Sequence, residues 1–424
     1  MQVLVIGSGG REHAIIKKLL IDSQISKIYA APGNAGISQD AICIAINAND
    51  ISAIVEFSLI EKIDFVVVAP DNPLVLGMVD ALEAVGIAAF GPKKAAAILE
   101  GSKVFAKDFM QKYNIPTAAY MVAENYKEAV AYVRKEDKYP VVLKSDGLAL
   151  GKGVIIANTE KEAMQGLHAL LVEKQFGESS SRVVIEEFLK GIEVSVLAFT
   201  DGITIVPLTA AMDHKKAYDN DLGLNTGGMG AIAPHPAYTE KIADVCMEKI
   251  YLPTIQGMEM ENRSFKGVLF FGLILTEKGP YVIEYNCRFG DPEAQVVLSL
   301  LDGDLLEIMQ AVRAGKLLEA SVGKKAGSAA CVILASGGYP NSYKVGYEIH
   351  GIEAEKELQN VVIYHAGTKE VDGKIVTAGG RVLGVTAICN SLRDALKKAY
   401  ARIEQISFTG MQYRKDIGKK AGEM

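Results

Sequence analysis

The first hundred residues alternate between two patterns of apolar positions. Short apolar runs at 3–7, 65–70 and 86–92 end at glycine or proline, as buried strands often do. Between them, the segments 11–22 and 78–86 place apolar residues three and four positions apart, which is typical of one face of a helix. This alternation predicts an α/β domain with a parallel sheet and helices on both faces.

The pattern changes twice further along the chain. A helix is predicted to begin at a candidate N-cap, Ser102, and to end before Pro116. The next region favours antiparallel strands, in 139–144 and 154–158 around a glycine loop and then in 183–189, 193–199, 204–211, 267–276 and 280–289. After Gly323, strands and one helix predict a small α+β domain. We therefore expect three domains, at 1–101, 102–325 and 326–424.

Composition narrows the class of protein. The chain has 424 residues, of which 49% are hydrophobic and 23% charged, as in an ordinary globular protein. A net charge of −6 without a basic block argues against a nucleic-acid partner. No apolar run is long enough to cross a bilayer, and the opening residues do not resemble a signal peptide. The five scattered cysteines, each best explained as a small buried side chain, indicate a reducing compartment, so we expect a cytoplasmic protein.

The first glycine turn, GSGGRE at 7–12, follows a strand and begins a helix, where a dinucleotide fingerprint would lie. That fingerprint needs glycine at the position of Glu12, and a carboxylate there would repel a pyrophosphate. NAD is therefore disfavoured. The turn could hold a single phosphate on its amide groups, or it could need glycine only for its backbone conformation.

The stretch KSDGLALGKGV, beginning at Lys144, places three glycines among its lysines. It is not a P-loop, because Gly147 and Gly151 enclose only three residues and Gly153 replaces the magnesium-binding hydroxyl. Its amide groups, with Lys144 and Lys152, could hold a triphosphate, and the loop could close as a lid. The alternative is a flexible hairpin tip with solvated lysines.

Acidic residues gather where two predicted strands meet, in VIEEFLKGIEVSV. Glu186 and Glu187 end one strand, Leu189 lies in the connection, and Glu193 begins the next strand. The backbone there could pair with an adenine, and Glu193 could accept hydrogen bonds from ribose hydroxyls. Acidic residues at strand ends are, however, usually just solvated.

A polar face interrupts the apolar strand YVIEYNCRFGDPEAQ. Side chains alternate along a strand, so Glu284, Asn286 and Arg288 point the same way, about 6.6 Å apart from one to the next. A carboxylate beside an amide oxygen suits Mg²⁺, which takes its other ligands from phosphates and water. Arg288 adds a fork for a carboxylate or phosphate. Burying these groups without partners would cost several kcal/mol, roughly, which favours a functional role.

The segment 213–231 is long, polar and glycine-rich. Loops of this length without structure of their own are usually functional or disordered. Its NTGGMG part could expose consecutive amide groups to an anion, and Asp213, His214 and Lys215 could orient an amine or a carboxylate. A mobile surface loop is the alternative.

Taken together, these motifs resemble the ATP-grasp superfamily and, within it, the phosphoribosylamine–glycine ligase family. The resemblance covers nearly the whole chain and rests on GSGGREHA, APGNAG, EGSKVFAK, KSDGLALGKGV, DHKKAYDNDLGLNTGGMGA, RFGDPEAQ, TAGGRVLGV and GMQYRKDIG. It implies a Rossmann-like pre-ATP-grasp domain, an ATP-grasp domain with a mobile lid at about 120–187, and the closing α+β domain.

The resemblance also implies a reaction and its participants. ATP would phosphorylate the glycine carboxylate, and 5-phosphoribosylamine would then attack the acyl phosphate to give glycinamide ribonucleotide, ADP and phosphate in purine biosynthesis. The reaction would need Mg²⁺ or Mn²⁺. We expect no nucleic-acid or membrane partner, and a monomer or weak homodimer.

The resemblance implies site residues at the positions of this sequence that match the family's motifs. The ATP-binding residues would be Lys103, Lys144, Gly147, Gly151, Lys152, Gly153, Glu186, Glu187, Leu189 and Glu193. Glu284 and Asn286 would hold the metal. The glycine carboxylate and acyl phosphate would lie against Arg288 and the NTGGMG amides, hence Asn225, Thr226, Gly227, Gly228 and Met229, with Asp213 and Lys215 as further catalytic residues. Phosphoribosylamine would contact Gly9, Gly10, Asn34 and Asp71.

The chain departs from the family pattern at a few positions. The strand before Glu284 carries no second acidic residue, Asp71 stands where a glutamate is usual, and Asn220 and Leu224 replace glycine and proline. Three rival interpretations are an ATP-grasp ligase acting on bicarbonate, an NAD-dependent dehydrogenase, and a non-catalytic nucleotide-binding protein. The polar face with Glu284 argues against the last.

Overall fold

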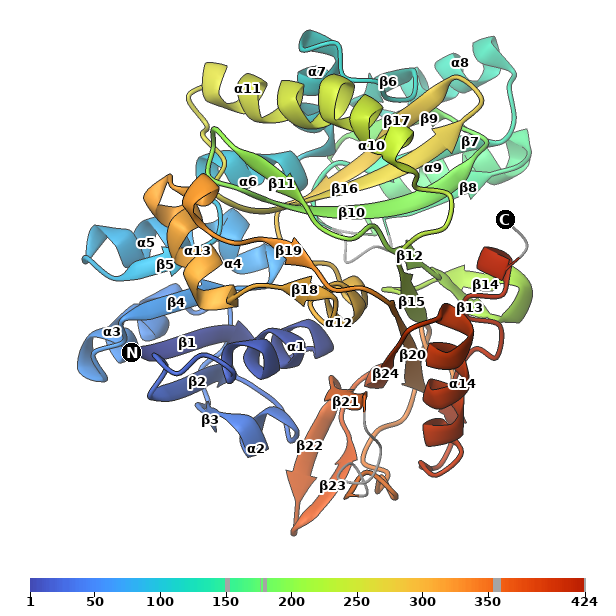
Figure 1. The fold of residues 1–424 in the computed structure, drawn as a ribbon. Helices are drawn as coiled ribbons and strands as arrows, with labels where there is room; N and C mark the ends of the chain where they lie inside the picture. The colour runs from blue at the N-terminus through green and yellow to red at the C-terminus, as the bar shows by residue number, and fades with distance from the viewer. Residues whose placement is uncertain (149–152, 176, 178–180, 354–359, 423–424) are drawn as a thin grey trace.

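The computed structural model describes residues 1–148, 153–175, 177, 181–353 and 360–422. Its amino-terminal part is a five-stranded sheet in the order β3-β2-β1-β4-β5 (Figure 1). All its strand pairs are parallel, which confirms the parallel sheet predicted from the sequence. The strands are β1 (Gln2–Gly7), β2 (Lys27–Pro32), β3 (Ile42–Cys43), β4 (Phe65–Val68) and β5 (Ala88–Phe90). The helices are α1 (Gly10–Leu19), α2 (Ile37–Asp40), α3 (Ile51–Ile60), α4 (Asp71–Leu76) and α5 (Met78–Ala84).

The centre of the molecule is an antiparallel sheet in the order β11-β10-β16-β17. Its strands are β10 (Ile192–Thr200), β11 (Ile205–Pro207), β16 (Gly267–Thr276) and β17 (Gly279–Asn286). The accompanying helices are α6 (Lys94–Gly101), α7 (Lys103–Lys112), α10 (Glu240–Cys246), the π-helical turn η3 (Met247–Tyr251) and α11 (Leu252–Met260). Ser102 caps α7 as predicted, because its hydroxyl accepts the Phe105 amide hydrogen.

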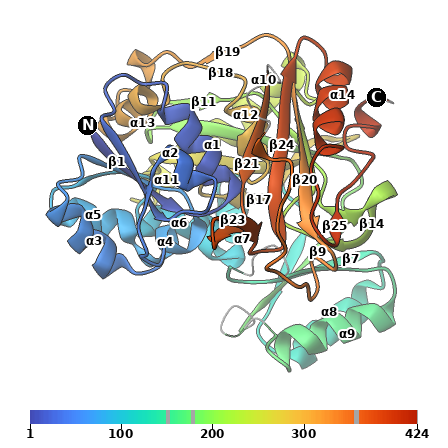
Figure 2. The same ribbon diagram turned by 90° about the horizontal axis from the view of Figure 1, so that it is seen from below.

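A second antiparallel sheet, β6-β9-β7-β8, forms the region for which the resemblance implies a lid. It contains β6 (Tyr120–Ala123), β7 (Val141–Ser145), β8 (Val154–Ala157) and β9 (Val183–Glu187), with α8 (Tyr126–Glu136) and α9 (Glu160–Leu171). Figure 2 shows it projecting from the body, with α8 and α9 side by side. The pairing of β7 with β8 confirms the predicted hairpin, although Gly151 and Lys152 at its tip lie outside the described residues.

The third sheet has the order β12-β15-β20-β24-β21, and β25 also pairs with β20. Its strands are β12 (Met212–Asp213), β15 (Gly230–Ala233), β20 (Ser328–Ser336), β21 (Val361–His365), β24 (Arg381–Cys389) and β25 (Met411–Gln412). The hairpin of β22 (Thr368–Val371) and β23 (Lys374–Thr377), the helix α14 (Leu392–Ile403) and the 3₁₀ turn η6 (Lys420–Gly422) complete this part. Because β12 and β15 come from the middle of the chain, this sheet joins the two halves of the molecule.

The segment 213–231 is not the unstructured loop that its composition predicts. It forms a small hairpin of β13 (Lys216–Tyr218) and β14 (Leu222–Asn225) around the 3₁₀ turn η2 (Asp219–Asp221). The carboxyl-terminal region holds this hairpin, since Arg414 Nη1 donates to Asp221 Oδ1 at 2.8 Å. Such distant partners leave no local sequence signal.

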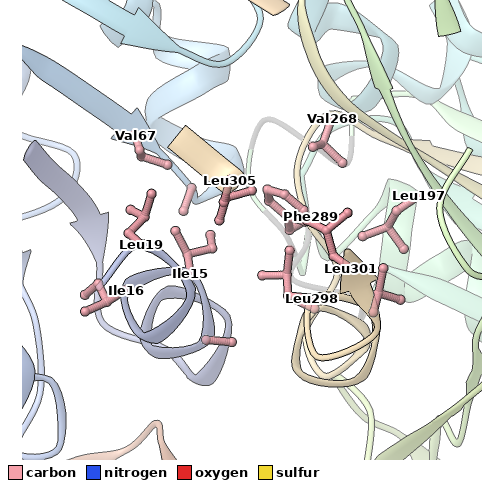
Figure 3. Packing of buried hydrophobic residues seen from close by; sticks show 14 of the residues in the cluster. Ile15, Ile16, Leu19, Val67, Leu197, Val268, Phe289, Leu298, Leu301 and Leu305 are labelled. Atoms are coloured by element: carbon pink, nitrogen blue, oxygen red, sulfur yellow. The ribbon is translucent and has the colours of Figure 1, made fainter. Parts of the chain in front are cut away.

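A shared core fixes the amino-terminal sheet against the rest of the protein. After β17 the chain forms α12 (Glu293–Val297), β18 (Leu301–Asp302), α13 (Leu305–Ala314), the 3₁₀ turn η4 (Leu317–Glu319) and β19 (Gly323–Lys324). Figure 3 shows Ile15 and Leu19 of α1 facing Phe289 and Leu298 across one apolar cluster. Each such buried side chain contributes about 1.5–3 kcal/mol, so the turn before α1 is held rigidly against residues 288–295.

Candidate functional site

Two neighbouring strands form a polar face in the central sheet. Glu284 and Asn286 both lie on β17, and Gly272 of β16 pairs with Glu284. A Cβ atom added to Gly272 would lie 2.9 Å from Glu284 Cγ, so the partner strand gives this carboxylate room and carries no acid of its own. These two strands therefore offer a metal only the two ligands predicted from the sequence, the carboxylate of Glu284 and the amide oxygen of Asn286.

Cations surround the Glu284 carboxylate. Lys215 Nζ lies 3.8 Å from Glu284 Oε1 and 3.0 Å from Glu193 Oε2. Burial on its own would raise the pKa of Glu284, but Lys215, Lys144 and Lys103 together outweigh it and lower that pKa. The carboxylate is therefore ionised at neutral pH, and it lies among lysines that could also face a triphosphate.

Lys103 and Lys144 connect the lid to this region. Lys103 Nζ donates to the Gly147 carbonyl at 2.8 Å, and Lys144 Nζ donates to the Ile283 carbonyl at 3.0 Å. The carbonyl of Gly153, on the other arm of the hairpin, accepts the Ser145 amide hydrogen at 2.9 Å. Burial lowers the pKa of Lys103, and the neighbouring Lys144 adds to that effect, so a bound anion would stabilise both charges.

Glu186 lies near the end of β9, as the sequence predicts. Its buried carboxylate lies 3.0 Å from Lys144 Nζ and 3.7 Å from Lys107 Nζ. Lys107 is fixed in turn by Thr117 Oγ1 at 2.8 Å. The Glu186 side chain is thus part of a buried ion network, not a solvated strand end, and its contact with ATP stays a prediction.

The connection after β9 contains the other residues predicted to receive adenine and ribose. Glu187 accepts the Ala119 amide hydrogen at 2.9 Å, which fixes the end of β9. The backbone of Leu189 has no hydrogen-bond partner among the described residues. Glu193 is 58% exposed and is held by Lys215. A free peptide group beside an exposed carboxylate is the arrangement that adenine and ribose require.

The NTGGMG segment does not present free amide groups, and that expectation is wrong. The Thr226 amide donates to the Lys215 carbonyl at 2.8 Å, and the Met229 amide donates to the His214 carbonyl at 2.9 Å. The Gly227 amide donates to the Tyr339 hydroxyl at 3.1 Å, and the Gly228 amide donates to the Thr226 hydroxyl at 3.0 Å. The amides are satisfied because the hairpin and the carboxyl-terminal sheet pack around them. Contacts of these residues and of Asn225 with a substrate stay predictions.

Arg288 is the centre of a buried network of charges. Its Nη2 lies 3.1 Å from Glu100 Oε1 and 4.0 Å from Asp71 Oδ2, and it donates to Asn286 Oδ1 at 3.1 Å. Burial raises the pKa of Glu100, although Arg288 acts in the opposite direction. Asp71 therefore faces Arg288, which places the two predicted site residues together.

Three buried polar atoms close to this network have no hydrogen-bond partner among the residues that the structure describes, namely Asp213 Oδ1, Arg288 Nε and Gln295 Oε1. Burial raises the pKa of Glu293, and burial together with Glu293 raises the pKa of Asp213. Unsatisfied buried groups cost free energy, so together they indicate a ligand that brings both a donor and an acceptor. A zwitterion has that character.

The glycine turn before α1 packs against the same region. The Gly9 amide donates to Glu12 Oε2 at 2.6 Å, so this amide is not free for the phosphate that the sequence suggested. A Cβ atom on Gly10 would lie 2.6 Å from Gln295 Nε2, which shows that glycine permits close packing there. A substrate contact at either glycine stays a prediction.

Asn34 uses its whole side chain inside the protein. Its amide group donates to the carbonyls of Ser8 and His365, and its oxygen accepts from the amides of Gly36 and Ile37, each at 2.9 Å. No hydrogen-bonding capacity remains for a ligand, so the predicted substrate contact through this side chain is not supported. Asn34 instead joins the amino-terminal domain to the carboxyl-terminal one.

The sequence did not indicate several residues that organise the site. They are Glu100, Lys107, Asp146, Arg182, Glu293, Tyr339 and Arg381. Asp146, for example, accepts from the Val104 amide at the start of α7 at 2.9 Å and pairs with Arg182. These residues stand far from their partners in the chain, and only the fold brings them together.

Comparison with known proteins identifies the family. Models of the N, ATP-grasp (A) and C domains of phosphoribosylglycinamide synthetase match residues 1–100, 101–294 and 329–420. The chain belongs to this family. It is 49% identical to the phosphoribosylamine–glycine ligase of Caldanaerobacter subterraneus subsp. tengcongensis, over 98% of this chain and 99% of that protein. The crystal structure of phosphoribosylamine–glycine ligase from Thermotoga maritima has a TM-score of 0.84 at 35% identity and covers 98% of this chain and 100% of that one.

More distant structures share the fold alone. The biotin carboxylase domain of Hydrogenobacter thermophilus 2-oxoglutarate carboxylase, in complex with MgADP, ADP and bicarbonate, has a TM-score of 0.74 at 18% identity, covering 97% of this chain and 91% of that one. Within the phosphoribosylglycinamide synthetase family the dehydrogenase interpretation has no support. Among the described residues, no helix combines the length and apolar character needed to cross a bilayer.

Proposed function

We propose that the chain joins glycine to 5-phosphoribosylamine at the expense of ATP, giving glycinamide ribonucleotide, ADP and phosphate. The observation that carries this proposal is the group of unpartnered buried atoms on Asp213, Arg288 and Gln295. A zwitterionic amino acid complements it, with its carboxylate at the guanidinium and its ammonium near the two carboxylates Asp213 and Glu293. The family relatives, which are named phosphoribosylamine–glycine ligases, support the same substrates.

The remaining side chains account for ATP. Lys103, Lys144 and Lys215 would neutralise the triphosphate, and the Leu189 backbone and Glu193 would receive the adenine and ribose. Glu284 and Asn286 fit a hard divalent cation, and no group of three or more His, Cys, Asp or Glu placed for a metal occurs in the described part of the chain. A bound Mg²⁺ or Mn²⁺ ion would neutralise phosphate charge during phosphoryl transfer.

Two chemical steps follow from this placement. The glycine carboxylate oxygen, aligned by Arg288, takes the γ-phosphoryl group and ADP leaves. The amine of phosphoribosylamine then attacks the acyl carbon, phosphate leaves, and the new amide nitrogen loses its proton. Closing the lid through Lys144 would keep water away from the acyl phosphate. We expect the enzyme to act as a monomer or weak homodimer.

Phosphate release from ATP in the presence of Mg²⁺ tests this function, with each substrate omitted in turn. We expect release to require both glycine and phosphoribosylamine. With glycine alone, hydroxylamine should trap the acyl phosphate as glycine hydroxamate. Release that instead depends on bicarbonate, or hydroxamate that never forms, would contradict the proposal.

A further inference from the structure

Arg381 joins the two loops that enclose the glycine end of the site. Its Nη1 donates to the Gly227 carbonyl at 2.7 Å and to the Asp291 carbonyl at 2.5 Å. Its Nη2 lies 3.1 Å from Asp291 Oδ2. A planar guanidinium can bind several acceptors in fixed directions, so one side chain sets the separation of the two loops.

The carboxyl-terminal sheet holds Arg381 in place. Arg381 is the first residue of β24 and pairs with Ala335 of β20, at a shift of register after Leu334. β20 also pairs with β15, which directly follows the Gly227–Gly228 loop. The arginine and one of the loops it binds therefore belong to the same sheet, which makes their relative position rigid.

The two loops pack closely around the contacts of Arg381. A Cβ atom on Gly227 would lie 3.1 Å from Arg381 Cζ. One on Gly228 would lie 2.6 Å from Asp213 Oδ1 and 2.4 Å from Pro292 Cδ. A shift of the Gly228 loop would therefore press on Asp213 of β12, and a shift of the Asp291 loop would move Arg288. Either shift would change the separation of Asp213 and Arg288.

Tyr339 supports the same loop from the other side. Its hydroxyl accepts the Gly227 amide hydrogen at 3.1 Å. The ring lies directly on Gly380, where a Cβ atom would come within 2.3 Å of Tyr339 Cδ2. Because residue 380 is glycine, the Tyr339 ring can lie this close to the chain. Tyr339 then binds the amide of Gly227, and Arg381 binds its carbonyl.

We propose that Arg381 is a positioning residue for glycine, acting through the Gly227–Gly228 loop and Asp291 to set the distance between Asp213 and Arg288. The inference rests on the proposed function and deepens it, because it makes the carboxyl-terminal domain part of the amino-acid site. Within the described part of the chain, the hydrogen bonds and ion pair of Arg381 go to Gly227, Gly228 and Asp291 and not to Lys103 or Lys144. Its loss should therefore affect glycine and leave ATP binding intact.

The test compares Arg381→Met with Arg402→Met, a control that also removes a buried arginine of the same domain. Arg402 bonds to the Gly351 carbonyl at 2.7 Å and to no residue of the site. For Arg381→Met we expect the KM for glycine to rise by about tenfold or more and kcat to fall by roughly 10²-fold, the loss typical of misplaced reacting groups. The Kd of a non-hydrolysable ATP analogue should stay within about threefold of wild type. Arg402→Met should change the melting temperature without this selective effect.

Two conservative variants separate positioning from folding. Arg381→Lys keeps the charge and the stem but reaches fewer acceptors, so its kinetic defect should be intermediate. Tyr339→Phe keeps the packing and should raise the KM for glycine by a few fold, roughly, since one neutral hydrogen bond is lost. In Arg381→Ala, millimolar guanidinium should restore part of the activity.

Several outcomes would overturn the inference. They are an unchanged KM for glycine in folded Arg381→Met, equal losses for glycine and the ATP analogue, or a Lys variant no better than Met. If Arg381→Met does not fold, the Lys and Tyr339→Phe variants decide the question by the same parameters. Failure of the proposed function would differ, because wild type itself would then show no glycine-dependent phosphate release.

Discussion

Lys215 Nζ lies 3.8 Å from Glu284 Oε1, close enough for the two charges to stabilise each other across the nucleotide region. The same ammonium group lies 3.0 Å from Glu193 Oε2. Lys215 therefore links the carboxylate proposed for the ribose to the carboxylate proposed for the metal. Because these contacts raise the pKa of Lys215 and lower that of Glu284, both groups are charged at neutral pH.

Glu284→Gln removes this charge and keeps the size of the side chain. We expect kcat to fall by at least ~10²-fold and the Mg²⁺ concentration for half-maximal turnover to rise, because an amide is a weaker ligand for a hard cation. Steady-state rates over a Mg²⁺ titration measure both effects. The exposed Glu277, on the turn of the same hairpin, provides the control Glu277→Gln, which should behave as wild type. Near-normal turnover by folded Glu284→Gln would contradict the assignment of Glu284 as a metal ligand.

Much of the fold could be predicted because its signals are local. The parallel sheet follows from apolar runs and helical spacing within a few residues, and the shared face of Glu284, Asn286 and Arg288 follows from strand alternation. The pairing of β7 with β8 likewise depended on one glycine-rich segment.

Predictions about individual contacts failed where the partner is distant in the chain. The Gly227 amide is satisfied by Tyr339, more than a hundred positions away, and the Asn34 side chain by His365 and others. Glu186 is an acidic strand end in the sequence, yet Lys107 and Lys144 enclose it in the structure. Hydrogen-bonding groups that look free in a sequence are usually satisfied in a fold, and the sequence does not show by which residue.

Gly228→Ala should damage both stability and glycine binding. Gly228 has φ +109°, which alanine rarely adopts, and the added methyl group would overlap Pro292 and Asp213. We expect a loss of about 3 kcal/mol in the free energy of unfolding from strain and overpacking. Urea unfolding measures this loss, and the KM for glycine should rise in the folded fraction.

Gly373→Ala is the matched control for that variant. Gly373 also has a positive φ, +73°, but nothing lies within 4 Å of its Cβ position. It should lose only about 1 kcal/mol and keep the wild-type KM for glycine. Similar losses in the two variants would show that strain alone, and not the contact with Asp213, explains the requirement for glycine at 228.

His214 should make stability depend on pH. Its buried ring accepts the Gly418 amide hydrogen at Nε2 over 3.0 Å, while Nδ1 faces the Gly230 carbonyl at 3.3 Å. Protonation of Nε2 would break the bond to Gly418. Burial, assisted by Arg414, lowers the pKa of His214 to about 4, from an ordinary value of 6.5.

The sign follows from proton uptake by the two states. As pH falls below 6.5, His214 becomes protonated in the unfolded chain, whereas in the folded protein it stays neutral until about pH 4. The free energy of unfolding therefore decreases progressively below pH 6.5. Through His214 alone, the free energy of unfolding should fall by about 2 kcal/mol between pH 7 and pH 5. Urea unfolding at both pH values should show that wild type loses more than His214→Gln, whose amide can still accept from Gly418. His168→Gln, at a half-exposed site, should keep the wild-type dependence, and equal pH dependence in wild type and His214→Gln would contradict the prediction.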